Sequence, residues 1–120
     1  MNKKTVVIGA SENPERYSYL AVMKLCLLQH EVIAIGKSTG HIGNIQIINE
    51  NPVIVGVHTI TLYINPILQK EFYNYILSIN PKRIIFNPGA ENNELFNLAK
   101  EHNIEPIIAC TLVLLSTGMY

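Results

Sequence analysis

The residues from Gly9 to Pro14 have the types and spacing of a phosphate-binding turn. They read Gly-Ala-Ser-Glu-Asn-Pro and lie between the apolar run 6–8 and a stretch with helical spacing of apolar side chains. Gly9 can adopt backbone angles that a side chain would forbid, and the free N–H groups at the start of the following helix favour an anion. We therefore predict that phosphate groups bind at this junction. The residues expected to contact them are Gly9, Ala10, Ser11 and Asn13.

A second interpretation of the same residues needs no ligand. Asn13 is a favoured helix N-cap and Pro14 a favoured first helical residue, so the segment also suits an ordinary turn between a strand and a helix. If the turn does bind phosphate, replacing Gly9 with valine is expected to abolish binding and to leave the protein folded.

The end of the second expected strand indicates the type of nucleotide. Enzymes that use NAD commonly place a carboxylate there for the ribose hydroxyls. Here the sequence continues Ile35-Gly36-Lys37-Ser38, and the whole chain contains no aspartate. Lys37 favours a phosphate on the ribose, as in coenzyme A or NADP, although a solvated loop lysine is the other interpretation. The first turn also has one glycine where the dinucleotide fingerprint has three.

The elements that must position these residues alternate between strand and helix. Apolar periodicity and turn residues predict strands at 5–9, 31–35, 59–64, 83–87 and 105–109, and helices at about 14–29, 66–79 and 91–102. The strands are apolar on both faces, as in a parallel sheet with helices on both sides. This pattern predicts an α/β fold with a single Rossmann-like, doubly wound and mainly parallel sheet.

Three segments carry more specific expectations. Glycines interrupt the segment 36–57, which is expected to form a loop and a short edge strand. The last ten residues, 111–120, suit a short apolar helix or a dimer surface. The first helix is expected to pack on the sheet through one stripe. The residues of that stripe are Tyr17, Leu20, Ala21, Leu27 and Leu28.

A doubly wound sheet also predicts where a ligand binds. The site lies at the carboxyl ends of the strands, where the strand order reverses, which here falls between the first strand and strand 59–64. Asn65 and Pro66 then lie opposite the first turn, and the loop that follows strand 83–87 adds Pro88 and Gly89. Near the start of the first helix, Arg16 is placed to meet a phosphate, and Tyr19 to cover adenine or a pantetheine arm.

Composition excludes several classes of function. The chain has 120 residues, the size of one domain expected over 1–120, and its nine basic and nine acidic side chains cancel. No overall field attracts nucleic acid, and no apolar run approaches the ~20 residues that span a membrane, so a cytoplasmic location is expected. Cys26 and Cys110 are far apart, and the four histidines are scattered. No metal site and no catalytic group are therefore expected.

Several short motifs occur together in one order. They are Gly9-Ala10-Ser11, Asn13-Pro14, Arg16-Tyr17-Ser18-Tyr19, His30-Glu31-Val32-Ile33, Asn87-Pro88-Gly89 and Cys110-Thr111-Leu112-Val113. Over essentially its whole length the chain resembles the small stand-alone CoA-binding domain proteins of bacteria. The resemblance implies a Rossmann-like domain related to the nucleotide-binding domain of succinyl-CoA synthetase alpha subunits. It implies binding of coenzyme A or an acyl-CoA through the first glycine turn, and it implies no reaction. One departure is Gln29, where such sequences often have glycine to cap the first helix.

Two other functions remain open from the residues alone. Lys37 and the missing acid also suit an NADP-dependent oxidoreductase or a redox sensor. Alternatively, the fold binds no nucleotide and serves as a structural or regulatory homodimer that associates through residues 112–120.

Overall fold

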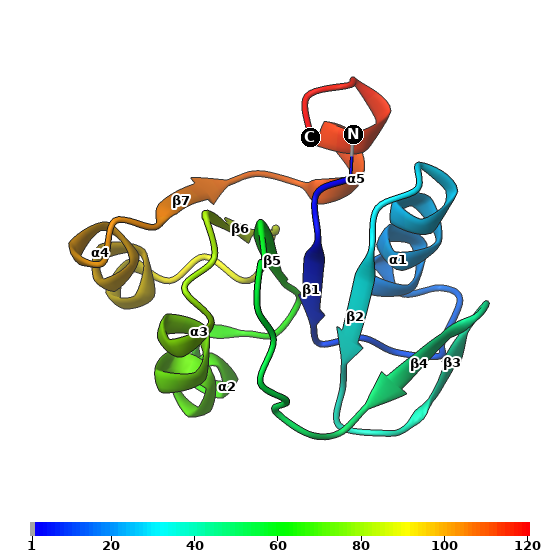
Figure 1. Ribbon diagram of the computed structural model, residues 1–120, viewed down its shortest axis with the longest axis horizontal. Helices are drawn as coiled ribbons and strands as arrows, with labels where there is room; N and C mark the ends of the chain where they lie inside the picture. Colours follow the sequence, from blue (N-terminus) through cyan, green and yellow to red (C-terminus); the bar gives the residue numbers. More distant parts are fainter. Residues whose placement is uncertain (1) are drawn as a thin grey trace.

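The computed structural model describes residues 2–120, which form a seven-stranded, mostly parallel sheet flanked by helices (Figure 1). The strands are β1 (Thr5–Ile8), β2 (Val32–Ile35), β3 (Gly40–Ile42), β4 (Ile45–Ile48), β5 (Thr59–Leu62), β6 (Arg83–Phe86) and β7 (Glu105–Ile108). The helices are α1 (Tyr17–Leu27), α2 (Pro66–Gln69), α3 (Tyr73–Ile79), α4 (Asn93–Glu101) and α5 (Thr111–Ser116), with the short 3-10 helix η1 (Lys70–Phe72) between α2 and α3. The predicted α/β fold class is confirmed.

The strand order places β1 at the centre of the sheet. The order is β3-β4-β2-β1-β5-β6-β7. Val6 of β1 is in register with Ile33 of β2 on one side and with Ile60 of β5 on the other, and both pairings are parallel. Strands β2 to β4 thus lie on one side of β1, and strands β5 to β7 lie on the other. The order reverses between β1 and β5, as predicted for a doubly wound sheet.

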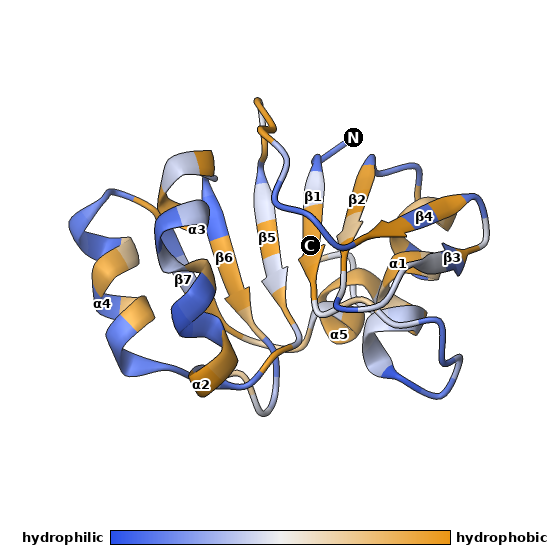
Figure 2. Ribbon diagram, turned by 90° about the horizontal axis from the view of Figure 1, so that it is seen from below, coloured by the Kyte–Doolittle hydropathy of each residue, from blue (hydrophilic) through white to orange (hydrophobic). Residues whose placement is uncertain are grey.

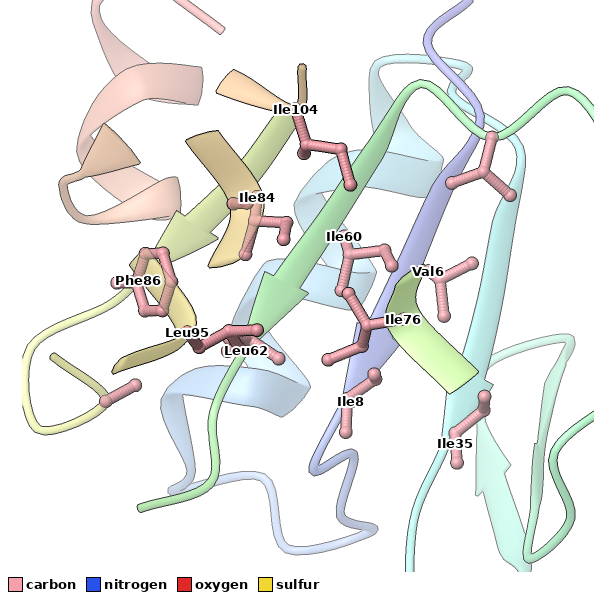
Figure 3. Packing of buried hydrophobic residues seen from close by; sticks show 13 residues of the cluster. Val6, Ile8, Ile35, Ile60, Leu62, Ile76, Ile84, Phe86, Leu95 and Ile104 are labelled. Carbon is pink, nitrogen blue, oxygen red and sulfur yellow. The ribbon is translucent and has the colours of Figure 1, made fainter. Parts of the chain in front are cut away.

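Side chains from the two faces of the sheet form two buried layers. Helices α2, α3 and α4 cover one face, and α1 and α5 cover the other (Figure 1). On the first face, apolar residues of β1, β5 and β6 lie with Ile76 of α3 and Leu95 of α4 in one cluster (Figure 3). On the second face, Val7 shares a cluster with Leu25 of α1 and Leu115 of α5. Burial on both faces explains why most residues of the central strands are apolar. Their buried polar residues are Thr5, Thr59, Thr61 and Arg83.

The segment after β2 forms a hairpin rather than the predicted loop and single edge strand. Strand β3 pairs antiparallel with β4, and β4 pairs parallel with β2. Gly43 in the turn has φ +58, in the left-handed region that favours glycine. Ile42 and Ile47 are buried on the α1 side of the sheet. Gly40 and Gly43 interrupt the apolar pattern of this segment, so the sequence does not reveal that its two strands pair with each other.

The first helix differs from its prediction in both its start and its buried face. Helix α1 begins at Tyr17, because Asn13 to Arg16 form a separate turn. Its buried residues are Ser18, Ala21, Val22 and Leu25. Of the predicted stripe only Ala21 is buried, and Tyr17, Leu20, Leu27 and Leu28 are exposed. The prediction was wrong because apolar side chains occur on nearly every side of this helix, so their spacing does not identify one face.

The end of α1 shows why a glycine would suit position 29. Gln29 has φ +67, its N–H donates to the Cys26 carbonyl at 2.9 Å, and the N–H of His30 donates to the Leu25 carbonyl at 3.0 Å. This is a Schellman cap, in which a left-handed residue satisfies the last carbonyls of a helix. A side chain in this conformation costs about 1 kcal/mol.

The amino-terminal edge of the sheet is closed by the last residues of the chain. Helix α5 confirms the predicted short helix, and the Tyr120 hydroxyl contacts the Thr5 hydroxyl. The guanidinium carbon of Arg83 lies 4.3 Å from the centre of the Tyr120 ring, and the His30 ring packs edge-on against the same ring. Leu115 and Tyr120 thus belong to the folded structure. Truncation of residues 112–120 would expose the core as well as remove a surface.

His30 and His58 make the stability of this edge depend on pH. The Nδ1 atom of His30 accepts a hydrogen bond from the Lys3 amide at 2.9 Å, which requires an unprotonated nitrogen. Burial, assisted by the positive charges of Lys3 and Arg83, lowers the pKa of His30 below its usual value of 6.5, and burial and the same charges lower the pKa of His58.

We predict that the free energy of unfolding falls as the pH drops below about 6.5. The unfolded histidines take up protons there and the folded ones resist, so protons favour the unfolded state. Urea unfolding at several pH values between 5 and 8 measures the effect. His30→Gln should reduce the fall, because glutamine can accept the Lys3 hydrogen bond without titrating. The exposed His41→Gln is the control, and an equal slope in all three proteins would contradict the assignment.

Candidate functional site

The carboxyl ends of the parallel strands meet at one edge of the molecule. Figure 2 shows the arrowheads of β1, β2, β5 and β6 pointing toward this edge. The loops that follow these strands contain Gly9 to Arg16, Gly36 and Lys37, Tyr63 to Asn65, and Asn87 to Ala90. The predicted site residues are therefore brought to the same edge, on both sides of the point where the strand order reverses.

Gly9 holds the loops after β1 and β5 together. Its φ is +99, and a Cβ atom on it would lie 3.0 Å from the carbonyl carbon of Tyr63 and 2.9 Å from Cγ2 of Ile64. The backbones approach so closely that any side chain at position 9 would push the loops apart. A Gly9→Val substitution is therefore expected to disturb the turn itself, so a loss of binding in that variant would not separate ligand contact from the shape of the loop.

The first turn uses two of its own amides to bind β2. The N–H groups of Gly9 and Ala10 both donate to the Ile35 carbonyl, at 2.9 Å each. A Cβ atom on Gly36 would overlap the Ala10 carbonyl oxygen, so a glycine is needed there too. These two amides shape the turn and are not available to a phosphate group. Any direct donors to a ligand must come from later in the loop.

The residues after Ala10 form a second turn before α1 starts. The Asn13 amide donates to Oγ of Ser11 at 3.1 Å, and Oδ1 of Asn13 accepts from the Glu15 amide at 3.0 Å. Asn13 therefore caps this turn and not the helix. Arg16 is the N-cap of α1 and makes no side-chain capping bond.

Several backbone donors are consequently left open at this edge. Within residues 2–120, no protein acceptor is hydrogen-bonded to the amides of Ser11 and Glu12 or to the first three amides of α1. The start of a helix carries a partial positive charge, and unpaired amides there attract anions. Arg16 is exposed and directly precedes α1. Lys37 is also exposed and follows β2, the strand that pairs with β1.

Glu12 makes a contact with the hairpin that the sequence did not reveal. Its Oε2 atom accepts a hydrogen bond from the His41 amide at 3.0 Å, and Gly40 leaves room for the Glu12 side chain. The carboxylate is thereby directed toward β3 and links the first turn to the hairpin. No motif pairs residues 12 and 41, so only the hairpin itself explains the contact.

A buried glutamine joins the loops after β5 and β6. Nε2 of Gln69 donates to the carbonyls of Ile64 and Ala90, both at 2.8 Å, and its Oε1 accepts from Asn92 at 2.8 Å. Its side chain is fully buried. Asn65, predicted to face the first turn, uses Oδ1 to cap α2 by accepting from the Leu68 amide at 3.0 Å. Pro66, predicted with it, is the first residue of α2. Proline suits this position, because a backbone N–H there would have no partner within the helix.

Asn87 connects β5, β6 and α5 beneath the surface. Its Nδ2 donates to Oγ1 of Thr61 at 2.7 Å and to the Leu62 carbonyl at 2.8 Å, and its Oδ1 accepts from the Thr111 amide at 2.8 Å. From the sequence, the neighbouring Pro88 and Gly89 are assigned to the ligand site, and no sequence pattern indicates the buried network of Asn87. Every polar group of this side chain is used within the protein.

The remaining predicted residues have different environments. Pro88 and Gly89 are exposed, and the Gly89 amide donates to Oε1 of Glu91 at 2.7 Å. Tyr19 is half-buried against the α1 side of the core, which leaves part of its ring accessible. Burial raises the pKa of Tyr63 to about 12, so this hydroxyl stays protonated and adds no negative charge to the edge.

Two hollows lie away from these residues. One of about 650 Å³ is lined by residues such as Lys4, His58 and Lys82, and one of about 260 Å³ by residues such as Lys3, His30 and Tyr120. Both are at the amino-terminal edge, where the strands begin. We assign the candidate site to the opposite edge, because the open amides and the strand reversal are there.

Two further searches cover residues 2–120. No group of three or more histidine, cysteine or acidic side chains is arranged to hold a metal ion in this part of the chain. None of the helices described is long and apolar enough to cross a membrane.

Comparisons with known proteins find a matching family and similar folds. A family model described as "CoA binding domain" matches residues 3–116. The crystal structure of an uncharacterized protein is 52% identical, covers 100% of this chain and 99% of its own, and has a TM-score of 0.97. A hypothetical protein from Pyrococcus horikoshii is 19% identical over 93% of this chain and 80% of its own (TM-score 0.78). A protein from Thermus thermophilus is 16% identical over 98% and 91% (TM-score 0.78). A comparison with curated proteins gave no match.

Gly9 and Gly89 allow the crowding at the first turn to be measured. Both have similar positive φ angles, +99 and +93, but no atom lies within 4 Å of a Cβ built on Gly89. Gly89→Ala should lower the free energy of unfolding by the backbone strain alone, about 1–3 kcal/mol. Gly9→Ala should cost more, because its Cβ also meets the Tyr63 backbone. Denaturant unfolding measures the free energy of unfolding of both variants. An equal decrease in the two would show that the loops after β1 and β5 can move apart at no energetic cost.

Proposed function

Because the chain belongs to the CoA binding domain family, we propose that it binds coenzyme A or an acyl-CoA at the carboxyl edge of its sheet. The proposal covers binding and includes no catalytic step. It places the protein in the cytoplasm, with Cys26 and Cys110 as free thiols.

The observation that carries the proposal is the set of open amides at the switch point. The pyrophosphate of coenzyme A is a dianion, and the amides of Ser11 and Glu12 together with the start of α1 provide donors for it. Gly9 and Ala10 act indirectly, because they fix the turn that presents these donors. Arg16 adds a full positive charge at the same helix end.

The other proposed contacts surround this anion site. Lys37 is assigned to the phosphate on the ribose, since it follows β2, where dinucleotide-binding folds recognise the ribose. Tyr19 offers a partly exposed ring to the adenine or the pantetheine arm. The remaining assigned residues form the far side of the edge. They are Asn65 and Pro66 at the start of α2, and Pro88 and Gly89 after β6, whereas Asn13 in the first turn is assigned with Ser11 to the pyrophosphate.

Calorimetric titration with coenzyme A tests the proposal directly. Ligand-stripped protein should bind coenzyme A with a Kd of about 1–100 μM and should bind NADP, NAD and ATP more weakly under the same salt conditions. Ser11→Asp should weaken binding at least about tenfold, because it adds a negative charge beside the pyrophosphate. Ser11→Asn is the matched control, since its neutral side chain can still accept from the Asn13 amide. Failure of the wild type to bind would overturn the function, and equal binding by the two variants would overturn the location.

A pair of ligands isolates the role of Lys37. Dephospho-coenzyme A lacks only the phosphate on the ribose, so it should bind wild-type protein less tightly than coenzyme A does. Lys37→Ala should weaken coenzyme A about tenfold and leave dephospho-coenzyme A nearly unchanged, because the lost ion pair exists only with the phosphate. Lys100→Ala, which removes an exposed lysine from α4, is the control. Equal weakening of both ligands would assign Lys37 a role other than phosphate recognition.

A further inference from the structure

The outer face of α1 is apolar although it faces solvent. Leu20, Met23 and Leu27 follow one another at spacings of three and four residues, so they form one ridge along the helix. Their side chains are 41%, 44% and 73% exposed. Tyr17 and Leu28 continue the exposed apolar surface at the two ends. We call these five residues the α1 ridge.

The ridge contrasts with the usual surface of a helix that packs on a sheet. Helix α4 buries Leu95 and Ala99 and carries glutamates and a lysine on its other sides. Helix α1 buries a face of its own, and Lys24 is its single charged residue. A helix that is apolar on nearly all sides is normally covered on all sides. Contiguous exposed apolar surface of this kind marks an interaction site.

A second copy of this chain is the occupant that fits the ridge best. In a two-fold dimer, the same surface of each copy contacts that of the other, so the surface must be self-complementary. An apolar strip with almost no charge meets this requirement. The chain has no net charge, so no long-range repulsion opposes association of two copies. A partner recognised by charge would find only Lys24 on this helix.

The size of the surface is also suitable. Helix α5 packs beside α1, and its Val113 and the nearby Met119 are 56% and 70% exposed. Together with the ridge, these side chains extend the exposed apolar surface toward the about 800 Å² that each partner buries in a standard interface. The ridge and the adjoining residues of α5 therefore form the surface that the dimer would bury.

We propose that the protein forms a two-fold homodimer in which the α1 ridges of two copies pack antiparallel. In this arrangement Leu20 of one copy meets Leu27 of the other, and Met23 lies near the two-fold axis. Antiparallel packing also places the negative end of each helix beside the positive end of its partner. The proposal does not depend on coenzyme A binding, because the ridge points away from the sheet.

Light scattering coupled to size-exclusion chromatography tests the dimer over a range of protein concentrations. The wild type should have twice the 13.5 kDa mass of one chain. Leu20→Lys and Leu27→Glu should each be monomeric, because each brings charge into an apolar contact. Both positions are exposed, so circular dichroism should show an unchanged fold. Ile67→Glu is the control, since Ile67 is 80% exposed on α2 across the sheet and should leave the dimer intact.

Mixing the two variants tests the antiparallel arrangement. Leu20→Lys and Leu27→Glu meet as opposite charges only if residue 20 faces residue 27 of the other copy, so an equimolar mixture should regain the dimer mass. A mixture that stays monomeric would overturn the antiparallel pairing. A monomeric wild type, or a dimer unaffected by either substitution, would overturn the proposal as a whole.

Discussion

The carboxyl edge of the sheet depends on one contact between two stretches of backbone. Gly9 lies against the carbonyl group of Tyr63, closer than any side chain would permit. This contact joins the loop after the first strand to the loop after β5, which are the two loops that flank the strand reversal. Gly36 against Ala10 repeats the arrangement on the other side of β1. The lack of a side chain at Gly9 and Gly36 thus lets the loops of this edge pack against one another, and these neighbouring loops hold its polar groups in place.

The same constraint explains which backbone donors are left without a protein acceptor at this edge. In the first turn, the amides of Gly9 and Ala10 donate hydrogen bonds to the Ile35 carbonyl. In the next turn, Oδ1 of Asn13 accepts a hydrogen bond from a backbone amide. The backbone groups that remain open are those at the end of the turn and at the start of α1. Buried side chains elsewhere keep this arrangement rigid, since Gln69 and Asn87 use their amide groups to tie neighbouring loops. The open donors therefore need no rearrangement to meet a ligand.

The architecture was predictable from the sequence because it follows from local patterns. Strands apolar on both faces, alternating with helices, indicated the parallel sheet, and the doubly wound arrangement indicated where its strand order reverses. The buried face of α1 was not predictable, because apolar residues surround that helix and only the tertiary structure decides which side is covered. The roles of Gln69 and Glu12 were equally hidden, since each contacts residues more than twenty positions away. At the first turn the sequence identified the junction between strand and helix, but the hydrogen-bond partner of each amide depends on the three-dimensional structure.

The central place of β1 has a consequence for synthesis of the chain on the ribosome. Thr5 of β1 pairs with Thr59 of β5, whereas its other neighbour, Val32, emerges much sooner. At about 5–20 residues per second, β5 follows β1 after about 3–10 s. During this interval one edge of an apolar strand has no partner, and nascent chains on neighbouring ribosomes can pair with it. The innermost strand of the finished protein is thus the outermost one during translation, which is when a chaperone would be of most use.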